Sequence, residues 1–274
     1  MESQLQKRVQ RYGWDKAALY YETFWQQQLK PAQDLLLQMA SISEGEKVLD
    51  VACGTGLVSF RAAEQAGKTG SVLGTDISDR MIEVAKKIAE EKMVSNITFE
   101  RMDAEQLQLA DDSFDVVICA LGLMYVPDPS GAINEMLRVL KPGGAMVAAV
   151  WGERDHCGWA EIFEIVDKRV SSEVCPMFFQ LGTGNRLDLH LMKAGFDHIE
   201  SERIVTSLEY TSGDEACGAA FEGGPVALAY YKFTDDVKQE ARKEYISSID
   251  AYKKSTGYSV PGEFVVTKGV KRPG

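Results

Sequence analysis

Short runs of apolar residues alternate, along the first half of the chain, with segments whose apolar residues recur every three or four positions. The short runs are continuous, which is typical of strands buried on both faces of a parallel sheet. The segments between them, such as LVSFRAAEQAG at 57–67, have the spacing of amphipathic helices. We expect strands at 47–53, 71–76, 96–103, 114–121 and 145–151. This alternation predicts a doubly wound α/β sheet with right-handed crossovers.

The second half of the chain continues the pattern with more helix. We expect a helix at 158–170, a helix, a glycine turn and a strand across 188–210, two helical stretches within 214–256 and a last strand at 260–272. Ahead of the sheet, residues 15–40 are expected to form two helices that separate at Pro31.

These elements predict a single domain over 1–274, built on seven mostly parallel strands. Within it we expect a helical lid over 1–40, a ligand-binding core over 41–151, and a substrate-side half over 152–274 with a helical insertion at about 211–259.

The first strand ends in the stretch VLDVACGTGLVSF, where Asp50 precedes a turn that contains Gly54 and Gly56. Glycines between a strand and a helix let the backbone approach a ligand, and the helix start presents free N–H groups. In a dinucleotide fingerprint those groups hold a pyrophosphate, but here Ser59 replaces the third glycine. The carboxylate of Asp50 would also repel phosphates, so the turn favours a phosphate-free ligand with an ammonium group.

Two further acids stand at the ends of the next strands. Asp76 follows Gly54 by 22 residues, the spacing at which a carboxylate can accept both hydroxyls of a ribose. Asp103 is followed by Ala104, and a side chain there can receive an exocyclic amine. Because the carboxyl ends of parallel strands share one edge, we expect these acids to line one crevice together with Asp50. The set suits a nucleoside joined to a cationic amino acid, and S-adenosylmethionine fits that description.

Five stretches of the chain together resemble the class I S-adenosylmethionine-dependent methyltransferases, in the small-molecule group related to ubiquinone and menaquinone biosynthesis. They are VLDVACGTG (48–56), GTDIS (74–78), MDAEQL (102–107), FDVVICALGLMYVPDP (114–129) and LRVLKPGG (137–144). The resemblance covers roughly 41–151. It implies a Rossmann-like methyltransferase fold and S-adenosyl-L-methionine as the cofactor.

The resemblance also implies which residues would touch that cofactor. The first motif would contact its methionine part, Asp76 would hold the ribose, and Asp103 with Ala104 would hold the adenine. Ile77 and Met81 would flank the adenine ring, and Leu121 would lie beside the cofactor. The full set of expected cofactor residues is Asp50, Ala52, Gly54, Gly56, Asp76, Ile77, Met81, Asp103, Ala104, Leu121, Tyr21 and Trp25. Tyr21 and Trp25 are four residues apart, share one helical face, and stand where relatives roof the pocket.

A sulfonium is already a good methyl donor, so the protein mainly has to align the reacting atoms and exclude water. No metal is required for this, and the three histidines have no metal-ligand spacing. Many relatives carry a histidine pair in the loop that here reads GLMYVPD, where this chain has Met124 and Tyr125. We therefore name Tyr21, Tyr125 and His156 as the candidate catalytic residues.

The acceptor is expected to be a small molecule that is flat or apolar. Aromatic residues in the N-terminal segment and in FEGGPVALAYYKF (221–233) predict a roofed, aromatic pocket. The methylated atom stays open among O, N, C and S. Three other readings also stay open: a non-catalytic S-adenosylmethionine-binding protein, a nicotinamide-dependent oxidoreductase, and an enzyme that methylates arsenite with the help of its cysteines.

Composition narrows the partners and the location. A formal net charge of −11 disfavours nucleic acid, because no net positive field would gather a polyanion. The longest apolar run, at 116–126, is too short to span a bilayer, and the N-terminus lacks the apolar stretch of a signal peptide. The five cysteines are odd in number and lack a CxxC pair, as expected of free thiols in a cytoplasmic protein. The oligomeric state is not indicated.

Overall fold

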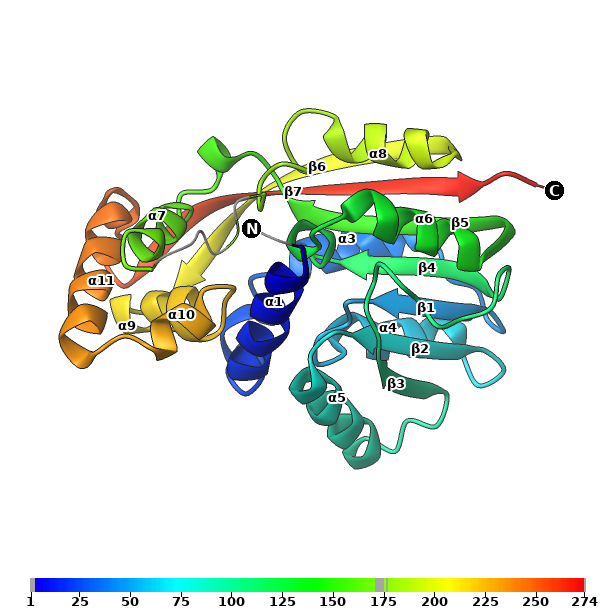
Figure 1. The fold of residues 1–274 in the computed structure, drawn as a ribbon, viewed down its shortest axis with the longest axis horizontal. Coiled ribbons are helices and arrows are strands. Elements are labelled where there is room, and N and C mark those ends of the chain that lie inside the picture. Colours follow the sequence, from blue (N-terminus) through cyan, green and yellow to red (C-terminus); the bar gives the residue numbers. More distant parts are fainter. Residues whose placement is uncertain (1–2, 171–174, 176, 274) are drawn as a thin grey trace.

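The structure is a computed structural model that describes residues 3–170, 175 and 177–273. A seven-stranded sheet with the strand order β3-β2-β1-β4-β5-β7-β6 runs through it, and helices cover its faces (Figure 1). All neighbouring strands pair in parallel except β7, which is antiparallel to both β5 and β6. The expected doubly wound, mostly parallel sheet is confirmed. The strands are β1 (Lys47–Val51), β2 (Ser71–Asp76), β3 (Ile97–Arg101), β4 (Phe114–Ala120), β5 (Leu140–Trp151), β6 (Phe196–Tyr210) and β7 (Tyr258–Lys271).

The helices begin where the sequence supplies capping side chains. The Ser78 hydroxyl accepts the backbone N–H of Met81 at the start of α5, and the Asp128 carboxylate accepts that of Gly131 at the start of α6. The α-helices are α1 (Ser3–Ala17), α2 (Tyr21–Trp25), α3 (Lys30–Ala40), α4 (Leu57–Ala66), α5 (Asp79–Glu91), α6 (Pro129–Val139), α7 (Glu161–Asp167), α8 (Arg186–Ala194), α9 (Gly213–Cys217), α10 (Ala227–Tyr231) and α11 (Asp235–Ser248). Short turns of 3₁₀ or π helix are η1 (Leu123–Tyr125), η2 (Arg154–His156), η3 (Gly218–Glu222) and η4 (Asp250–Tyr252). In the described part of the chain, no helix is both long enough and apolar enough to cross a bilayer.

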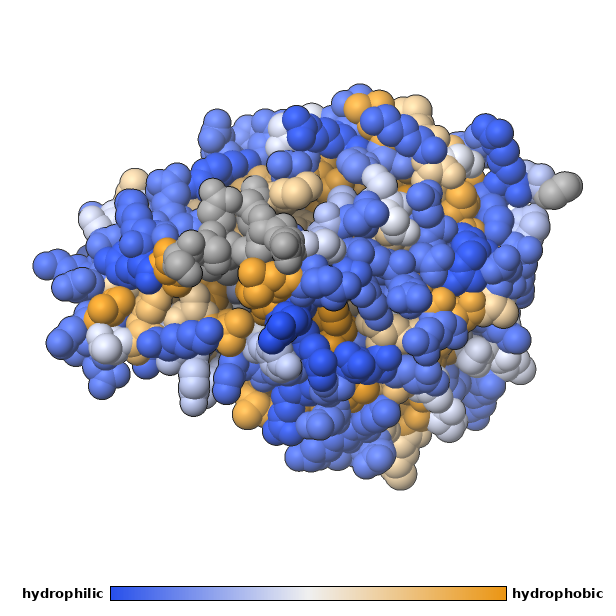
Figure 2. All heavy atoms as spheres, in the orientation of Figure 1, coloured by the Kyte–Doolittle hydropathy of each residue, from blue (hydrophilic) through white to orange (hydrophobic). Residues whose placement is uncertain are grey.

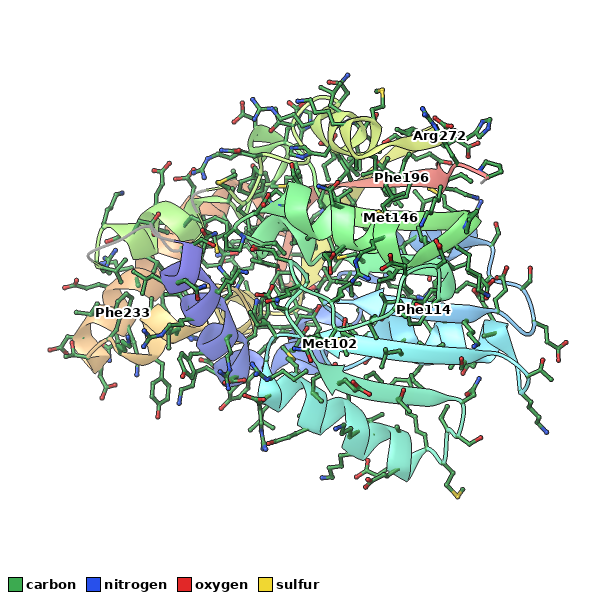
Figure 3. All side chains as sticks on the ribbon, turned by 45° about the vertical axis from the view of Figure 1, so that its right-hand side comes forward. Met102, Phe114, Met146, Phe196, Phe233 and Arg272 are labelled. Carbon is green, nitrogen blue, oxygen red and sulfur yellow. The ribbon has the colours of Figure 1, made fainter. Side chains whose placement is uncertain are left out.

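The central strands form the buried interior of the sheet. Val117, Ile118 and Val147 have no exposed surface, because helices cover both faces of β4 and β5. This double cover explains why the strands read as continuous apolar runs. Figure 3 shows the direction of the strands: Met102, just after β3, lies on the side that faces α1, and Phe114, at the start of β4, lies on the far side.

The N-terminal helices differ from the two helices expected over 15–40. Helix α1 already begins at Ser3, and Pro31 lies in the first turn of α3, so it does not separate two helices. In a first turn the missing N–H of proline costs no hydrogen bond. Helix α3 packs against β4, β5 and β7 and buries Leu36 and Leu37. It therefore covers the sheet, and only α1 and α2 form the lid.

Strand β5 begins before the expected residue 145, because α6 ends at Val139 and β5 starts at Leu140. Leu140 donates its N–H to the Met136 carbonyl, but its ψ of 139° is already extended. Pro142 cannot continue a helical hydrogen-bond ladder. The pairing of β4 with β5 shifts register between Phe114 and Val116, so LKPGG forms an irregular strand start.

The insertion between β6 and β7 contains the helical elements α9, η3, α10, α11 and η4, where two stretches were expected. It forms a lobe at the end of the long β6–β7 hairpin (Figure 1). Gly218 of this lobe lies against the ring of Phe24 in α2, so that a Cβ at Gly218 would collide with the ring. The insertion therefore packs directly on the lid.

Candidate cofactor and acceptor site

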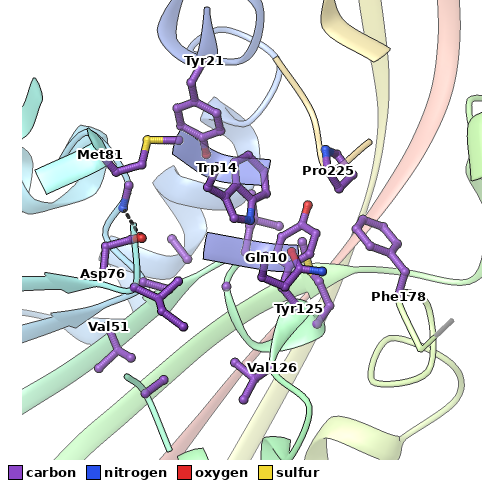
Figure 4. A pocket seen from close by; sticks show the side chains of 18 of the residues that line it. Gln10, Trp14, Tyr21, Val51, Asp76, Met81, Tyr125, Val126, Phe178 and Pro225 are labelled. Carbon is purple, nitrogen blue, oxygen red and sulfur yellow. Dashed lines mark hydrogen bonds between the residues drawn. The ribbon is translucent and has the colours of Figure 1, made fainter. Parts of the chain in front are cut away.

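A cavity lies between the carboxyl ends of β1–β4 and the two lid helices (Figure 4). About 1030 Å³ between these elements is not filled by protein atoms, and this space includes open solvent. We call its three sides the floor, the roof and the wall. The floor is Val51, Ala52, Gly54, Thr75, Asp76, Ile77, Asp103, Ala104 and Leu121; the roof is Lys7, Gln10, Trp14, Tyr21 and Trp25; the wall is Tyr125, Trp151, Trp159, Phe178, Gly224 and Pro225.

The backbone of the floor is unusual at two non-glycine positions. Ala52 has a φ of 56° and Leu121 a φ of 63°, both in the left-handed region. A Cβ on Gly122 would collide with Ala52, so the turns that follow β1 and β4 touch each other below the cavity. Non-glycine residues in this conformation gather at ligand sites, where the surrounding structure holds the strain.

Asp50 lies beneath the first turn and does not line the cavity. Its side chain is buried, its Oδ2 accepts the Ser59 hydroxyl at 2.5 Å, and its Oδ1 has no partner. Burial, together with the nearby charge of Asp76, raises the pKa of Asp50 to about 7, although the hydrogen bond from Ser59 opposes the rise. In the same turn, the hydroxyl of Thr55 is also buried without a partner. Direct contact between Asp50 and a ligand stays a prediction.

Asp76 lines the floor and is held by backbone groups. Its Oδ2 accepts the N–H of Gly54 at 2.9 Å, the bond drawn in Figure 4, and its Oδ1 accepts the N–H of Ser78 at 2.8 Å. Burial raises its pKa to about 6, although these two hydrogen bonds oppose the rise. Each carboxylate oxygen has a second lone pair, so Asp76 can still accept two ligand hydroxyls.

Asp103 also lines the floor but depends on the roof. Its Oδ2 accepts a hydrogen bond from Lys7 Nζ of α1 at 2.7 Å, and its Oδ1 accepts the backbone N–H of Glu105 at 3.0 Å. Lys7 also forms an ion pair with Glu105, with 2.5 Å between Nζ and Oε2. The lid therefore supplies one of the two groups that fix this carboxylate.

Aromatic rings join the roof to the wall. Trp14 meets Tyr21 edge-on, with ring centroids 5.8 Å apart, and meets Tyr125 in the same way at 5.0 Å. Figure 4 shows Trp14 between these two tyrosines, with Phe178 beyond. Tyr125 and Phe178 are 5.3 Å apart and also edge-on. Such ring pairs each stabilise the packing by about 0.5–1.5 kcal/mol beyond area burial.

A second aromatic group surrounds Trp151. Its ring centroid lies 6.2 Å from that of Trp25 and 4.7 Å from that of Trp159. The indole nitrogens of Trp25 and Trp159 are buried and have no hydrogen-bond partner. A buried donor without a partner is uncommon in a folded protein, so these two N–H groups, on side chains that line the cavity, favour a ligand with a lone pair.

The charges around the cavity favour a cation over a phosphate. Lys7 is the one cation among the described lining residues, and its charge is already paired with Asp103 and Glu105. Carboxylates and aromatic faces both attract a positive ligand. A pyrophosphate would meet Asp76 at the glycine turn and no free cation among the residues that the structure describes there.

Comparisons with known proteins agree with this geometry. A family model described as a methyltransferase domain matches residues 42–173. The demethylmenaquinone methyltransferase of Bacillus velezensis is 36% identical over 152 residues, which cover 56% of this chain and 65% of that protein. The enzyme of the same name from Bacillus subtilis is 29% identical over 211 residues, which cover 77% of this chain and 84% of that one. The crystal structure of the YcgJ protein from Bacillus subtilis superposes with a TM-score of 0.64 at 19% identity, over 89% of this chain and all of that one.

These similarities support a class I S-adenosylmethionine-dependent methyltransferase. Its match spans slightly less than two thirds of the Bacillus velezensis relative. The cofactor of this family is S-adenosylmethionine, and the cavity fits it. Two carboxylates, Asp76 and Asp103, face the same space as the glycine turn, and the cavity offers aromatic faces rather than free cations to a sulfonium.

The structure brings most of the expected cofactor residues together. Ten of them line the cavity: Tyr21, Trp25, Ala52, Gly54, Asp76, Ile77, Met81, Asp103, Ala104 and Leu121. Asp50 and Gly56 do not. Gly56 instead begins α4 with a φ of 91°, and a Cβ there would meet the ring of Phe99 at 2.9 Å. A glycine is therefore required at position 56 because the Phe99 ring packs against it behind the floor.

The three candidate catalytic residues are separated. Tyr21 and Tyr125 line the cavity, and burial raises the pKa of each, so both phenols stay protonated at neutral pH. His156 does not line it. Its side chain is 56% exposed in η2, and its Nδ1 lies 3.0 Å from Glu263 Oε1. The structure therefore does not bring His156 to the cavity, and a catalytic role for it stays a prediction.

Several lining residues were not among the expected site residues. Lys7, Gln10 and Trp14 share one face of α1, but the expected helix began only at residue 15. Their spacing of three and four residues is the signal that would have found them. Trp151 is the last residue of β5 and Trp159 follows eight residues later, so a tryptophan at a strand end was a signal for this part of the site. Phe178 carried no signal, because it lies outside every recognisable motif.

Proposed function

We propose that the protein transfers the methyl group of S-adenosylmethionine to a small, flat and largely apolar acceptor that carries an oxygen atom. The observation that carries this proposal is the meeting of an acidic floor with an aromatic roof and wall in one cavity. The two Bacillus relatives are named for a quinone substrate, demethylmenaquinone, which supports an acceptor of the quinone class.

The floor would hold the cofactor. When bound, S-adenosylmethionine supplies a methyl group on a positively charged sulfur that an in-line nucleophile displaces. Asp76 would accept hydrogen bonds from the ribose hydroxyls, and Asp103 would accept one from the adenine amine. Ile77 and Met81 line the same end of the cavity and would flank the base.

The roof and wall would hold the acceptor. Flat rings stack favourably against Trp14, Tyr125 and Phe178, and their burial excludes water from the reacting atoms. The free indole N–H groups of Trp25 and Trp159 would donate to an oxygen of the acceptor. An ammonium group has only donors, so it would leave both indoles unpaired.

The residues that line the cavity support a mechanism in which the protein aligns the acceptor and the methyl group and does not itself abstract a proton. Tyr21 and Tyr125 stay protonated and can donate hydrogen bonds, and no histidine occurs among the described residues that line the cavity. The acceptor would therefore arrive as its own nucleophile: an ionised phenol, an enolate or an electron-rich ring carbon. Positioning and desolvation would supply the rate enhancement.

We also infer a cytoplasmic location. All five cysteines are free and buried, which supports a reducing compartment. This inference is independent of the reaction.

The test combines binding with turnover. Calorimetry should detect S-adenosylhomocysteine and not a nicotinamide dinucleotide. Transfer of labelled methyl should then be measured with 2-naphthol, naphthohydroquinone, 2-naphthylamine and 2-naphthalenethiol as matched flat acceptors. We expect the two oxygen compounds to react fastest.

Three outcomes would contradict the proposal in distinct ways. Binding of S-adenosylhomocysteine without transfer to any acceptor would favour a non-catalytic binding protein. Tight binding of the dinucleotide alone would favour an oxidoreductase. Preference for the amine or the thiol would overturn the role of the indole donors.

A further inference from the structure

One face of α1 carries a charged row that ends on the cofactor side of the cavity. Lys7, Arg11 and Asp15 are four residues apart and therefore lie one above the other. Lys7 pairs with Asp103 and Glu105, Arg11 pairs with Asp79, and Asp15 Oδ1 accepts the Ser78 hydroxyl at 2.6 Å and the Arg80 N–H at 3.1 Å. All of these partners stand just after β2, just after β3 or at the start of α5.

Apart from this row, α1 is attached through the ring contacts of Trp14 and through its packing on α10, and it buries no large aliphatic side chain. Its buried residues are Gln6, Gln10, Gly13 and Ala17, whereas α3 buries Leu36, Leu37 and Met39. Figure 2 shows hydrophilic side chains gathered where α1 faces α5. Because hydrophobic stabilisation grows with apolar area, lifting α1 costs less than lifting α3 would. Charged contacts are therefore a large part of what holds α1 closed.

The two floor acids differ in how they are fixed. Asp76 is held by backbone N–H groups that belong to its own strand end and to the glycine turn. Asp103 is held partly by Lys7, which reaches it from a different element 96 residues earlier in the chain. When α1 moves away, Asp76 keeps both of its bonds, and Asp103 loses its cation.

We propose that Lys7 is a positioning residue for the cofactor: it holds Asp103 in place for the nucleobase and so couples closure of α1 to completion of the adenine end of the site. This inference rests on the proposed function, since it concerns the same cofactor. Helix α1 would thus have two roles: it covers the acceptor, and it sets the rate at which the cofactor is released.

The coupling is electrostatic, so it should respond to salt. The side chains of Lys7 and Asp103 are 18% and 31% exposed, which leaves the pair open to screening. The Debye length falls from about 10 Å at 0.1 M salt to about 3 Å at 1 M. Release of the cofactor product should therefore accelerate as salt rises, and only while Lys7 carries its charge.

The experiment measures S-adenosylhomocysteine release by stopped-flow tryptophan fluorescence, together with amide hydrogen exchange in α1. Lys7→Met keeps most of the side-chain length and removes the charge, and Lys7→Arg tests rescue. Lys30→Met is the matched control, because Lys30 pairs with Asp34 on α3 at 2.6 Å and does not line the cavity. Each protein is measured at 0.05 M and 0.5 M NaCl.

We expect Lys7→Met to release S-adenosylhomocysteine about fivefold faster at low salt, to exchange α1 amides faster, and to lose most of the salt dependence. Lys7→Arg and Lys30→Met should behave like the wild type. If Lys7→Met does not fold, Glu105→Gln, which keeps Asp103 intact, should show a smaller change in the same direction.

Two results would overturn the inference. Equal release rates and equal α1 exchange in Lys7→Met and Lys30→Met would show that Lys7 does not position Asp103. Tighter binding in Lys7→Met would show that Lys7 competes with the ligand for the carboxylate. A wild-type protein that fails to bind S-adenosylhomocysteine at all would overturn the proposed function as well, so the two failures are distinguishable.

Discussion

The floor and the roof of the cavity are built by different means. The floor consists of strand ends and tight turns, and its key acid Asp76 is fixed by backbone hydrogen bonds. The roof consists of helices that meet the rest of the protein through side chains: the charged row on α1 and the ring contacts of Trp14. A group that backbone hydrogen bonds hold keeps its position when the lid moves. A group that a side chain of the lid holds changes position with the lid.

This difference matches the two roles that we propose, in which the floor binds the cofactor and the roof and wall bind the acceptor. A cofactor that all members of a family use can bind at the rigid carboxyl edge of the sheet, because every member with this fold has that edge. An acceptor that varies between members needs a surface that changes without disturbing the sheet. Such a surface is provided by helices α1 and α2 together with the insertion. The insertion meets α2 where Gly218 lies against Phe24.

The largest effect on cofactor binding should come from removing the carboxylate of Asp76, which backbone hydrogen bonds hold in place. Asp76→Ala should weaken S-adenosylhomocysteine binding by about 2–3 kcal/mol, or roughly 30- to 150-fold, because it removes hydrogen bonds to a charged acceptor. It also leaves the N–H groups of Gly54 and Ser78 without their partner. Isothermal titration calorimetry measures the change.

Asp34→Asn serves as the control for Asp76→Ala, because Asp34 pairs with Lys30 and Arg61 at the surface of α3, away from the cavity. It should bind S-adenosylhomocysteine as the wild type does. An affinity for Asp76→Ala within twofold of the wild type would mean that the ribose is held elsewhere, and the floor would lose its assigned role.

The next largest effect should appear on the acceptor side. Trp25→Phe and Trp159→Phe each keep an aromatic ring but remove the buried indole N–H. Each should weaken 2-naphthol binding by about 1 kcal/mol, or roughly fivefold, and leave naphthalene binding nearly unchanged. Tryptophan fluorescence quenching gives both affinities.

Trp14→Phe is the matched comparison for these two variants, since Trp14 also lines the cavity but its nitrogen is not one of the buried unpartnered atoms found in the described residues. It should change the binding of 2-naphthol and naphthalene by the same factor. Equal losses for both ligands in Trp25→Phe would show that the ring packs and the N–H does not bind.

The floor could be predicted from the sequence because its chemistry is local. Asp76 and Gly54 stand at fixed offsets from strand ends that continuous apolar runs reveal, and the shared edge of a parallel sheet brings them together. The same logic placed Asp103 in this cavity, and the family resemblance added Leu121, although no pattern showed that Ala52 and Leu121 adopt positive φ. Strain of this kind follows from contacts between turns.

The roof could not be predicted in the same way, because its contacts join distant segments. The link from Lys7 to Asp103 spans 96 residues, and neither residue type signals the other. His156 differs in that proximity in sequence to the end of β5 suggested a role, but its side chain pairs with Glu263 and does not line the cavity. Strand β5 was expected only from residue 145, but it begins at Leu140, because a proline–glycine stretch can also form an irregular strand start.

A milder test uses pH. Ionised Asp50 and Asp76 are disfavoured by burial, which raises their pKa values from 3.8 to about 7 and about 6. A raised carboxyl pKa means that the stability it contributes is present below pH 3.8 and is lost as pH rises through the folded-state value. The stability advantage of Asp50→Asn over the wild type should thus grow between pH 4 and about pH 7, as urea unfolding measures.

A ligand that donates hydrogen bonds to Asp76 reverses this cost, since it prefers the ionised carboxylate. Affinity for S-adenosylhomocysteine should rise between pH 5 and pH 7 by up to about tenfold, as Asp76 loses its proton. In Asp76→Ala the rise should be smaller. A pH-independent affinity in the wild type would mean that the carboxylate is already ionised at pH 5, and the electrostatic account of the floor would need revision.

The smallest effect should come from a residue that belongs to neither side of the cavity. His156→Gln removes one contact to Glu263, but that buried carboxylate also accepts the Glu153 N–H at 2.9 Å and pairs with Arg203 at 2.8 Å. Because His156 is largely exposed, the free energy of unfolding should change by no more than about 0.5 kcal/mol. Methyl transfer should continue at the wild-type rate. A tenfold loss of kcat with unchanged S-adenosylhomocysteine affinity would bring His156 into the reaction, and would require the turn after β5 to fold over the cavity during catalysis.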